Sequence, residues 1–278
     1  METVLSANDL CVGYVCRCGV SPIHHHLNFS LRRGELVSLC GANGAGKSTL
    51  LRTISKLQPQ LAGDITLMDK PLGSYSEKEL SRTIGVVLTD RALTGGLTVE
   101  EVVSLGRQPY TGFFGRLSTE DKELVKNAIE SVGMADYTKK YMAELSDGER
   151  QKVMIAKTLV QECPVVILDE PTAGQDYKVY TEIMSFLDEL NKNYGITILF
   201  ITHDMHLAIE YTSRAIVFSE GKCIGDDSVY KILANNDIIE KANLKQTSLY
   251  TLATRVGMDP EKLINSFIQT ERSRRHGS

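Results

Sequence analysis

The strongest chemical signal in the sequence is a run of residues, Gly41 to Thr49, that reads G-A-N-G-A-G-K-S-T. It matches the phosphate-loop pattern G-x-x-x-x-G-K-[ST], which joins a strand to a helix. The residues from Leu36 to Cys40 favour a strand, and those from Ser48 to about Leu57 favour a helix. At such a helix N-terminus, free backbone N–H groups and the helix dipole attract anions. The run predicts a nucleoside triphosphate site, where Lys47 reaches the β- and γ-phosphates and the Ser48 hydroxyl binds Mg²⁺.

Two carboxylates follow another apolar run. Val165 to Leu168 is wholly apolar and strand-sized, and Asp169 and Glu170 come directly after it. The carboxyl ends of buried parallel strands are where open α/β sheets bind ligands. Asp169 is suited to hold Mg²⁺ through its water shell, and Glu170 is suited to polarise a water for attack on the γ-phosphate.

A third apolar run, Ile196 to Ile201, is followed by Thr202, His203 and Asp204. Because this run ends at the same edge of the predicted sheet, His203 could sense or stabilise the charge of the γ-phosphate. A helix cap made by His203 or Asp204 is the alternative.

A serine and a glycine begin a further helix in the run from Leu145 to Gln151, which reads L-S-D-G-E-R-Q. The helix is expected to continue to about Gln161. This start indicates a second anion site, although Ser146 before an acidic first turn is also an ordinary N-cap.

Upstream of the phosphate loop, Tyr14 could stack on a nucleotide base or pack as an edge-strand tyrosine. A nearby group of cysteines and histidines lacks the C-x-x-C and H-x₃₋₅-H spacings of zinc sites, so we expect a solvated loop there. The group consists of Cys16, Cys18, His24, His25 and His26.

Composition limits the class of protein. The chain has 278 residues and a formal net charge of −4, without the basic asymmetry that nucleic-acid binding favours. Its longest apolar runs fall far short of the roughly 20 residues that cross a bilayer. Met1 to Asn8 lacks the pattern of a signal peptide, so the six cysteines are expected to be reduced thiols in a cytosolic protein.

The middle of the chain predicts a separate helical lobe. Capping boxes at Thr98 and Ser118 begin helices that run to about Arg107 and Val132. The aromatic, glycine-rich link from Gln108 to Gly115 either packs under this lobe or presents a contact surface. The other strands are expected at Thr3 to Leu5, Leu27 to Leu31, Gly63 to Met68 and Ile84 to Leu88, with helices at Ser76 to Arg82 and Val179 to Leu190.

The ordered set of these motifs resembles the nucleotide-binding subunit of an ATP-binding cassette (ABC) transporter over nearly the whole chain. The resemblance implies an α/β fold: a P-loop NTPase (RecA-like) core with an N-terminal antiparallel β subdomain and an inserted α-helical subdomain. The ATPase domain would occupy residues 1–234, with the helical subdomain at about 97–161. Residues 235–278 would form a helical extension that ends in a frayed basic tail from Arg272 to Ser278.

The resemblance also implies a role for each motif. Lys47, Glu170 and the switch histidine His203 would be catalytic, and Ser48, Thr89 and Asp169 would bind Mg²⁺. ATP would contact the base-stacking Tyr14, the Walker A residues Gly41, Asn43, Gly44, Gly46, Lys47, Ser48 and Thr49, the signature residues Ser146, Gly148 and Glu149, and the D-loop Asp176. In this family two cassettes, identical or different, enclose ATP between the phosphate loop of one and the signature loop of the other.

Two departures from the family pattern matter. Thr89 stands where the family has a glutamine, directly after the strand Ile84 to Leu88. Coupling to a membrane subunit would therefore rest partly on Asp90. The signature reads S-D-G-E where S-G-G-Q is common, and Glu149 must therefore point away from the γ-phosphate.

Both departures are similar to a branch of iron-chelate and cobalamin-type importer ATPases, as are the stretches Leu105 to Tyr110 and Leu145 to Lys152. From about Ala173 onward the chain looks instead like the ATPases of energy-coupling-factor vitamin importers. This second resemblance rests on Ala173 to Tyr177, Thr202 to Leu207 and Ala242 to Leu249.

The expected function is therefore an importer ATPase at the cytoplasmic face of the membrane, held there by transmembrane permease subunits. A soluble cassette ATPase acting on DNA or ribosomes is the alternative. Chromosome and repair members carry a long coiled coil between phosphate loop and signature, whereas only about 100 residues separate Lys47 from Ser146 here. A module that has lost catalysis is opposed by the presence of Lys47, Asp169, Glu170 and His203 together.

Overall fold

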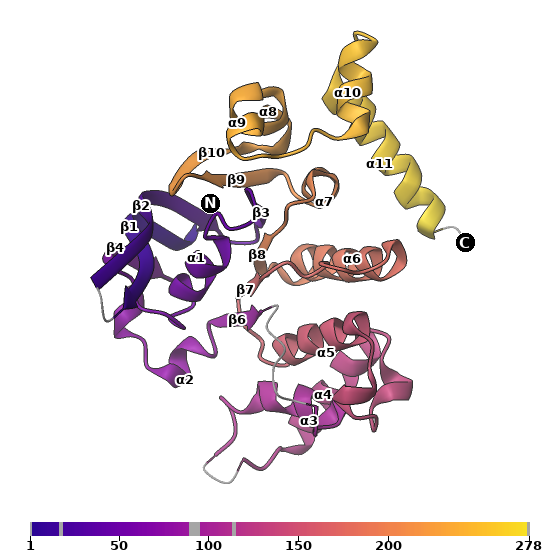
Figure 1. The fold of residues 1–278 in the computed structure, drawn as a ribbon. Coiled ribbons are helices and arrows are strands. Elements are labelled where there is room, and N and C mark those ends of the chain that lie inside the picture. The colour runs from indigo at the N-terminus through magenta and orange to yellow at the C-terminus, as the bar shows by residue number, and fades with distance from the viewer. Residues whose placement is uncertain (1, 17–18, 89–94, 113–114, 277–278) are drawn as a thin grey trace.

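The computed structural model describes residues 2–16, 19–88, 95–112 and 115–276 (Figure 1). Within them, one sheet of four strands has the order β2-β1-β4-β5 and a second sheet of six strands has the order β10-β9-β3-β8-β7-β6. The antiparallel sheet contains β1 (Thr3–Cys16), β2 (Gly19–Arg32), β4 (Ala62–Leu67) and β5 (Lys70–Pro71). The other contains β3 (Leu36–Cys40), β6 (Ile84–Val87), β7 (Val165–Leu168), β8 (Thr197–Ile201), β9 (Arg214–Ser219) and β10 (Lys222–Ser228).

The central strands of the six-stranded sheet run parallel. β3 pairs in parallel with β8 and β9, and β7 pairs in parallel with β6 and β8. Every residue of β3, β7 and β8 is buried, which is the pattern of strands covered on both faces. Because parallel strands end at one edge, the residues that follow β3, β7 and β8 are brought to a common edge.

Helix α1 (Lys47–Ile54) fills the space between the two sheets (Figure 1). Its Leu50, Leu51 and Ile54 are buried in one cluster with Leu5 of β1 and Phe218 of β9. The other face of the six-stranded sheet is covered by α6 (Tyr177–Tyr194) and α7 (Met205–Tyr211). The phosphate loop is therefore fixed at both ends by buried structure.

The predicted helical lobe is present. It contains α3 (Val99–Ser104), α4 (Thr119–Ser131) and α5 (Asp147–Leu159), which share one apolar cluster. The predicted capping boxes at Thr98 and Ser118 begin α3 and α4. Short α2 (Glu77–Leu80) precedes the lobe, and single 3₁₀ turns lie at Leu72–Ser74, Leu105–Arg107, Ala135–Tyr137 and Met142–Glu144.

Part of the link between α3 and α4 packs under this lobe. The guanidinium groups of Arg82 and Arg107 lie 4.6 and 4.0 Å from the ring centroid of Tyr110. The Tyr110 hydroxyl donates to the Gln161 carbonyl at 2.9 Å. Arg107 is itself buried and donates to the Asp121 carboxylate at 2.7 Å. Phe113 and Phe114, the aromatic pair of the same link, lie outside the described residues.

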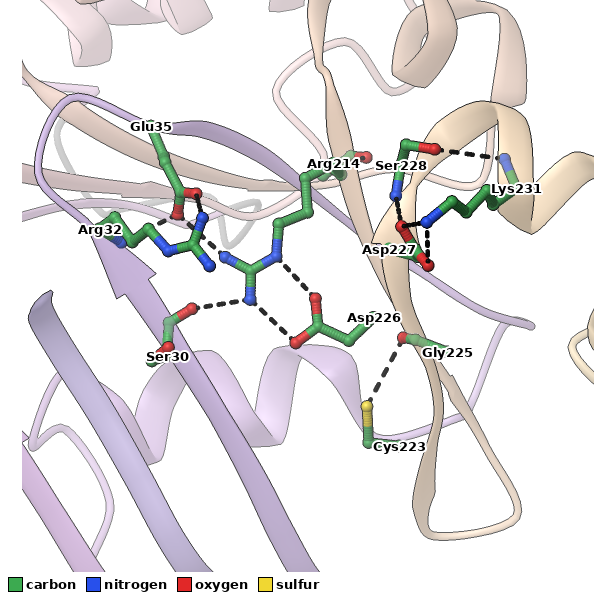
Figure 2. A network of polar contacts seen from close by, with 11 residues as sticks. Ser30, Arg32, Glu35, Arg214, Cys223, Gly225, Asp226, Asp227, Ser228 and Lys231 are labelled. Atoms are coloured by element: carbon green, nitrogen blue, oxygen red, sulfur yellow. Dashed lines mark hydrogen bonds and ion pairs between the residues drawn. The ribbon is translucent and has the colours of Figure 1, made fainter. Parts of the chain in front are cut away.

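Arg214 joins the two sheets (Figure 2). From β9 its guanidinium donates to the Asp226 carboxylate of β10 at 2.6 and 2.8 Å, to Glu35 at 2.9 Å, and to the Ser30 carbonyl of β2 at 3.0 Å. The Arg214 and Glu35 side chains are 16% and 17% exposed, and that of Asp226 is 29% exposed. One partly buried cation thus ties the antiparallel sheet to the edge of the six-stranded sheet.

Two expectations for the ends of the chain were wrong. The strands expected at Thr3 to Leu5 and Leu27 to Leu31 lie within two longer paired strands, β1 and β2. The solvated loop expected at the cysteines and histidines is not present as such, because His24 lies within β2 and is fully buried; Cys18 lies outside the described residues. Among the described residues, no three His, Cys, Asp or Glu side chains gather as a metal would require.

At the other end, α8 (Val229–Ala234), α9 (Asn236–Lys241), α10 (Ser248–Arg255) and α11 (Pro260–His276) form a helical extension. The frayed tail expected from Arg272 to Ser278 is helical as far as His276 instead, and Gly277 and Ser278 lie outside the described residues. Arg272 donates to the Glu210 carbonyl at 2.8 Å and pairs with Asp188 of α6 at 3.4 Å, so tertiary contacts order this end. No helix in the described part of the chain combines the length and apolar character needed to cross a membrane.

Candidate functional site

The phosphate loop connects β3 to α1 with a backbone that two of its glycines make possible. Gly46, the N-cap of α1, has φ 82°, and a Cβ there would lie 2.4 Å from Ile23 Cγ2 and 2.6 Å from His24 Nε2. A Cβ at Gly41 would lie 2.3 Å from the Phe218 carbonyl oxygen. The loop is therefore seated directly on β2 and β9, and only glycine fits at these two positions.

Lys47 folds back over this loop. Its Nζ donates to the carbonyl oxygens of Gly41 and Ala42, each at 2.8 Å, and the residue is only 5% exposed. Burial lowers the pKa of Lys47, while the nearby Glu170 and Asp169 act in the opposite direction. The lysine thus places a buried positive charge inside the loop, held by neutral carbonyls that a phosphate could replace.

Ser48 and Asp169 come together from α1 and the end of β7. The Ser48 hydroxyl donates to Asp169 Oδ1 at 3.0 Å, and Asp169 is 5% exposed. A hydroxyl and a carboxylate are the oxygen ligands that Mg²⁺ prefers, directly or through water. The donor set fits a magnesium ion. Thr89, the third expected metal ligand, lies outside the described residues, as does Asp90.

Glu170 and His203 face each other across neighbouring strand ends. His203 Nδ1 lies 3.6 Å from Glu170 Oε1, with side chains 59% and 28% exposed. Glu170 has φ 45°, a left-handed conformation that is uncommon outside glycine, at the turn directly after β7. The alternative role, a helix cap made by His203 or Asp204, is performed by Asp204. It accepts from the His206 N–H at 2.8 Å and is the N-cap of α7.

Tyr14 reaches the same loop from β1. Its hydroxyl lies 3.0 Å from Thr49 Oγ1, while the residue as a whole is 49% exposed. The hydroxyl is therefore fixed to the first turn of α1, and about half of the residue is open to solvent beside the phosphate loop.

The signature residues begin α5 of the helical lobe, and α5 lies apart from α1 (Figure 1). Ser146 is the N-cap of α5 in a full capping box with Glu149. Glu149 Oε2 accepts from the Ser146 N–H and from its hydroxyl, both at 2.8 Å, and the Glu149 N–H donates back to Ser146 Oγ at 3.3 Å. The carboxylate is therefore turned onto its own helix.

Gly148, one position before Glu149, meets the loop that precedes α6 and the first turn of α6. A Cβ at Gly148 would lie 2.5 Å from Gln175 Oε1 and 2.8 Å from Val179 Cγ1. Asp176 accepts from the Val179 N–H at 2.9 Å and is the N-cap of α6. The loop that contains Asp176 thus packs against the signature helix within one chain.

Sequence reasoning missed His24 as a neighbour of the site. Its ring is fully buried against Gly46 and Phe218, and both ring nitrogens lack a hydrogen-bond partner among the described residues. Burial lowers the pKa of His24, which favours the neutral ring. The available signal was Gly46. A glycine required at this position of the loop indicates that a side chain of another strand packs directly against the loop.

The fold and the site together define a P-loop nucleotide-binding cassette with an antiparallel β subdomain and a helical insertion, as predicted. Residues 24–173 match the family model of the ABC transporter, and the chain belongs to the ABC transporter family. This confirms the family, its α/β fold and its ATP-binding class. The match covers the phosphate loop, the signature and the strand end at Asp169.

Relatives of known sequence agree with this assignment. A Clostridium perfringens protein described as an ABC transporter ATP-binding protein is 42% identical over 252 residues, covering 90% of this chain and 44% of the relative. A Lactobacillus johnsonii protein with the same description is 41% identical over 248 residues, covering 87% and 42%. The chain thus spans less than half the length of these two relatives.

Solved structures match over nearly their whole length. The cbiO1 protein of Clostridium perfringens, described as part of the ABC transporter complex cbiONQ, is 32% identical with a TM-score of 0.72, covering 87% of this chain and 95% of that one. A bacterial ABC transporter cassette solved as a dimer is 27% identical with a TM-score of 0.71, covering 81% and 98%.

Proposed function

We propose that this chain is the ATP-hydrolysing subunit of an ABC importer that drives uptake of a small nutrient through membrane-spanning permease subunits. The nutrient class is an iron chelate, cobalamin or another vitamin or metal. The observation that carries the hydrolysis of ATP in this proposal is the convergence of Lys47, the Ser48–Asp169 pair and the Glu170–His203 pair at one edge of the sheet. Residues 1–234 would form the ATPase domain and residues 235–278 its extension.

ATP would bind with its base on the exposed side of Tyr14 and its phosphates over the loop that contains Gly41, Asn43, Gly44, Gly46 and Thr49. Lys47 would leave the carbonyls of Gly41 and Ala42, now 2.8 Å from its Nζ, and neutralise the β- and γ-phosphates. Because the lysine is already desolvated, this exchange requires little loss of its hydration.

Ser48 and Asp169 would hold a magnesium ion, the Ser48 hydroxyl directly and Asp169 through water. When bound, Mg²⁺ supplies positive charge that stabilises the phosphate oxygens during transfer. Loss of the Asp169 carboxylate would leave the Ser48 hydroxyl without its acceptor as well.

Glu170 would accept the proton of the attacking water, and His203, 3.6 Å away, would position it and stabilise charge on the γ-phosphate. Both side chains are open enough to meet a water and a phosphate.

The second anion site would serve a different nucleotide. Ser146 and Gly148 begin α5, which lies apart from α1 (Figure 1), so together with Asp176 they would bind the γ-phosphate held by a second cassette. That cassette would be a second copy of this chain or a sister domain. The solved dimer of a similar cassette supports a paired arrangement.

Membrane partners would hold the chain at the cytoplasmic face as a peripheral subunit. Assembly into a transporter complex is supported by the similarity to cbiO1, which is described as part of the ABC transporter complex cbiONQ. The two-branch resemblance to iron-chelate and vitamin importers supports the nutrient class. The groove between the catalytic core and the helical lobe would receive the permease.

The proposal is tested by purifying the tagged chain from membranes in mild detergent and reconstituting the recovered complex in liposomes. We expect an integral membrane subunit to co-purify and labelled iron chelate or cobalamin to accumulate with ATP. A matched complex that carries Glu170→Gln should assemble and fail to transport. Recovery of the chain with ribosomes or DNA, in a nuclease-sensitive manner, would favour the soluble alternative.

A further inference from the structure

The signature loop contains an anion of its own. Glu149 Oε2 accepts from both donors of Ser146, the backbone N–H and the hydroxyl, at 2.8 Å. These donors are at the start of α5, where free N–H groups and the helix dipole attract negative charge. The Glu149 carboxylate therefore already takes both donors of Ser146.

The Glu149 carboxylate is firmly held. The Ser146 N–H, together with the Ser146 and Tyr137 hydroxyls, keeps the pKa of Glu149 below its ordinary value. The other acid of the loop is balanced separately, because Asp147 pairs with Arg150 at 2.8 Å. Glu149 is left as an ionised group that Ser146 itself stabilises.

A second capping box with nearly the same distances lies outside the signature loop, so it has the capping role without the proposed phosphate-binding role. At the start of α3, Glu101 accepts from the Thr98 N–H at 2.8 Å and from its hydroxyl at 2.9 Å, with the return bond at 3.3 Å. Both boxes stabilise a helix end to a similar extent. Only the box at Ser146 lies in the signature loop, so only there would the carboxylate oppose an incoming phosphate.

We propose that Glu149 is an internal competitor that occupies the Ser146 donors until the γ-phosphate of a nucleotide on a second cassette displaces it. Ser146 is exposed, so a partner can reach it without unfolding of α5. The displaced carboxylate must then remain near the phosphate or turn to solvent, and either outcome opposes pairing. Glu149 thus sets how tightly two ATP-loaded cassettes associate. This inference rests on the proposed pairing of cassettes around ATP.

The test measures self-association of the full chain by light scattering and analytical ultracentrifugation with saturating Mg-ATP. All variants carry Glu170→Gln so that nucleotide is not consumed. Glu149→Gln keeps the shape and one acceptor oxygen but removes the charge. We expect it to lower the dimer dissociation constant by about tenfold, as expected for removing one solvent-screened charge beside a phosphate. Glu101→Gln, the matched control, should leave that constant unchanged.

Four outcomes are distinguishable. Tighter pairing with Glu149→Gln alone supports the inference. Equal or weaker pairing overturns it while the paired arrangement stands, and equal tightening by Glu101→Gln also overturns it. No association of any variant, with nucleotide demonstrably bound, overturns the pairing proposal and the inference together. If Glu149→Gln does not fold, Glu149→Ala, which frees Ser146 entirely, takes its place with the same expected direction.

Discussion

Replacement of Arg214 by methionine should destabilise the chain through the junction of its two sheets. Methionine retains part of the aliphatic volume but removes every bond to Asp226, Glu35 and the Ser30 carbonyl. Breaking a fully buried pair costs about 3–5 kcal/mol. Asp226 is 29% exposed and Glu35 is 17% exposed, so water can solvate part of the two carboxylates that lose their partner. We therefore expect the free energy of unfolding to fall by about 2–3 kcal/mol.

Thermal and urea unfolding without nucleotide measure this change. For a chain of this size the loss corresponds to a fall in Tm of about 5–10 °C. Arg33→Met is the matched control, since Arg33 pairs with Glu2 at 2.9 Å through side chains that are 52% and 54% exposed. Its effect should stay within about 0.5 kcal/mol. Equal shifts for the two variants would refute the assignment of Arg214 as the tie between the sheets.

Three further outcomes are expected. Tyr14→Ala should weaken ATP binding by about 1–3 kcal/mol if the ring stacks on the base, while Tyr14→Phe should keep most of the affinity; an unchanged dissociation constant for Tyr14→Ala contradicts stacking. Gly46→Ala should abolish nucleotide binding in a fluorescence titration, because φ 82° and contacts of 2.4 and 2.6 Å leave no place for a Cβ; normal binding contradicts the seating of the loop. Asp121→Asn should lower stability at pH 7, because the Ser118 N–H and Arg107 lower the pKa of Asp121 and so stabilise its charged form. This difference should be constant above the unfolded pKa of about 4 and shrink as the pH falls through the lower folded value, as urea unfolding across that range would report.

The central strands and helix starts could be predicted because their signals are local. A mainly apolar run, interrupted only by Ser38, predicted β3 and a wholly apolar run predicted β7, both with the observed bounds, since strands buried on both faces need no polar alternation. Capping boxes marked α3 and α4 because the cap and its acid are three residues apart in the sequence. The place of Asp169 and Glu170 at the site could be predicted because open α/β sheets bind ligands at the carboxyl ends of their parallel strands.

The parts that were missed depend on contacts between distant residues. The segment around His24 mixes histidine, serine and proline, so nothing local marks it as a long strand beneath the phosphate loop. Arg272 looks like part of a basic tail until Asp188 and the Glu210 carbonyl are placed beside it. The contact of Gln175 with Gly148 likewise required the folded chain.

The most direct test of ATP hydrolysis by this chain is the turnover of Mg-ATP by the membrane complex, with and without Glu170→Gln, while nucleotide binding is measured in parallel. An amide keeps the size of the carboxylate but cannot accept the proton of the attacking water. We expect turnover to fall by about 10²–10⁴, the range for a lost general base, with binding retained. Undiminished turnover of the Glu170→Gln complex would contradict the assignment of Glu170 as the base and, with it, the proposed site.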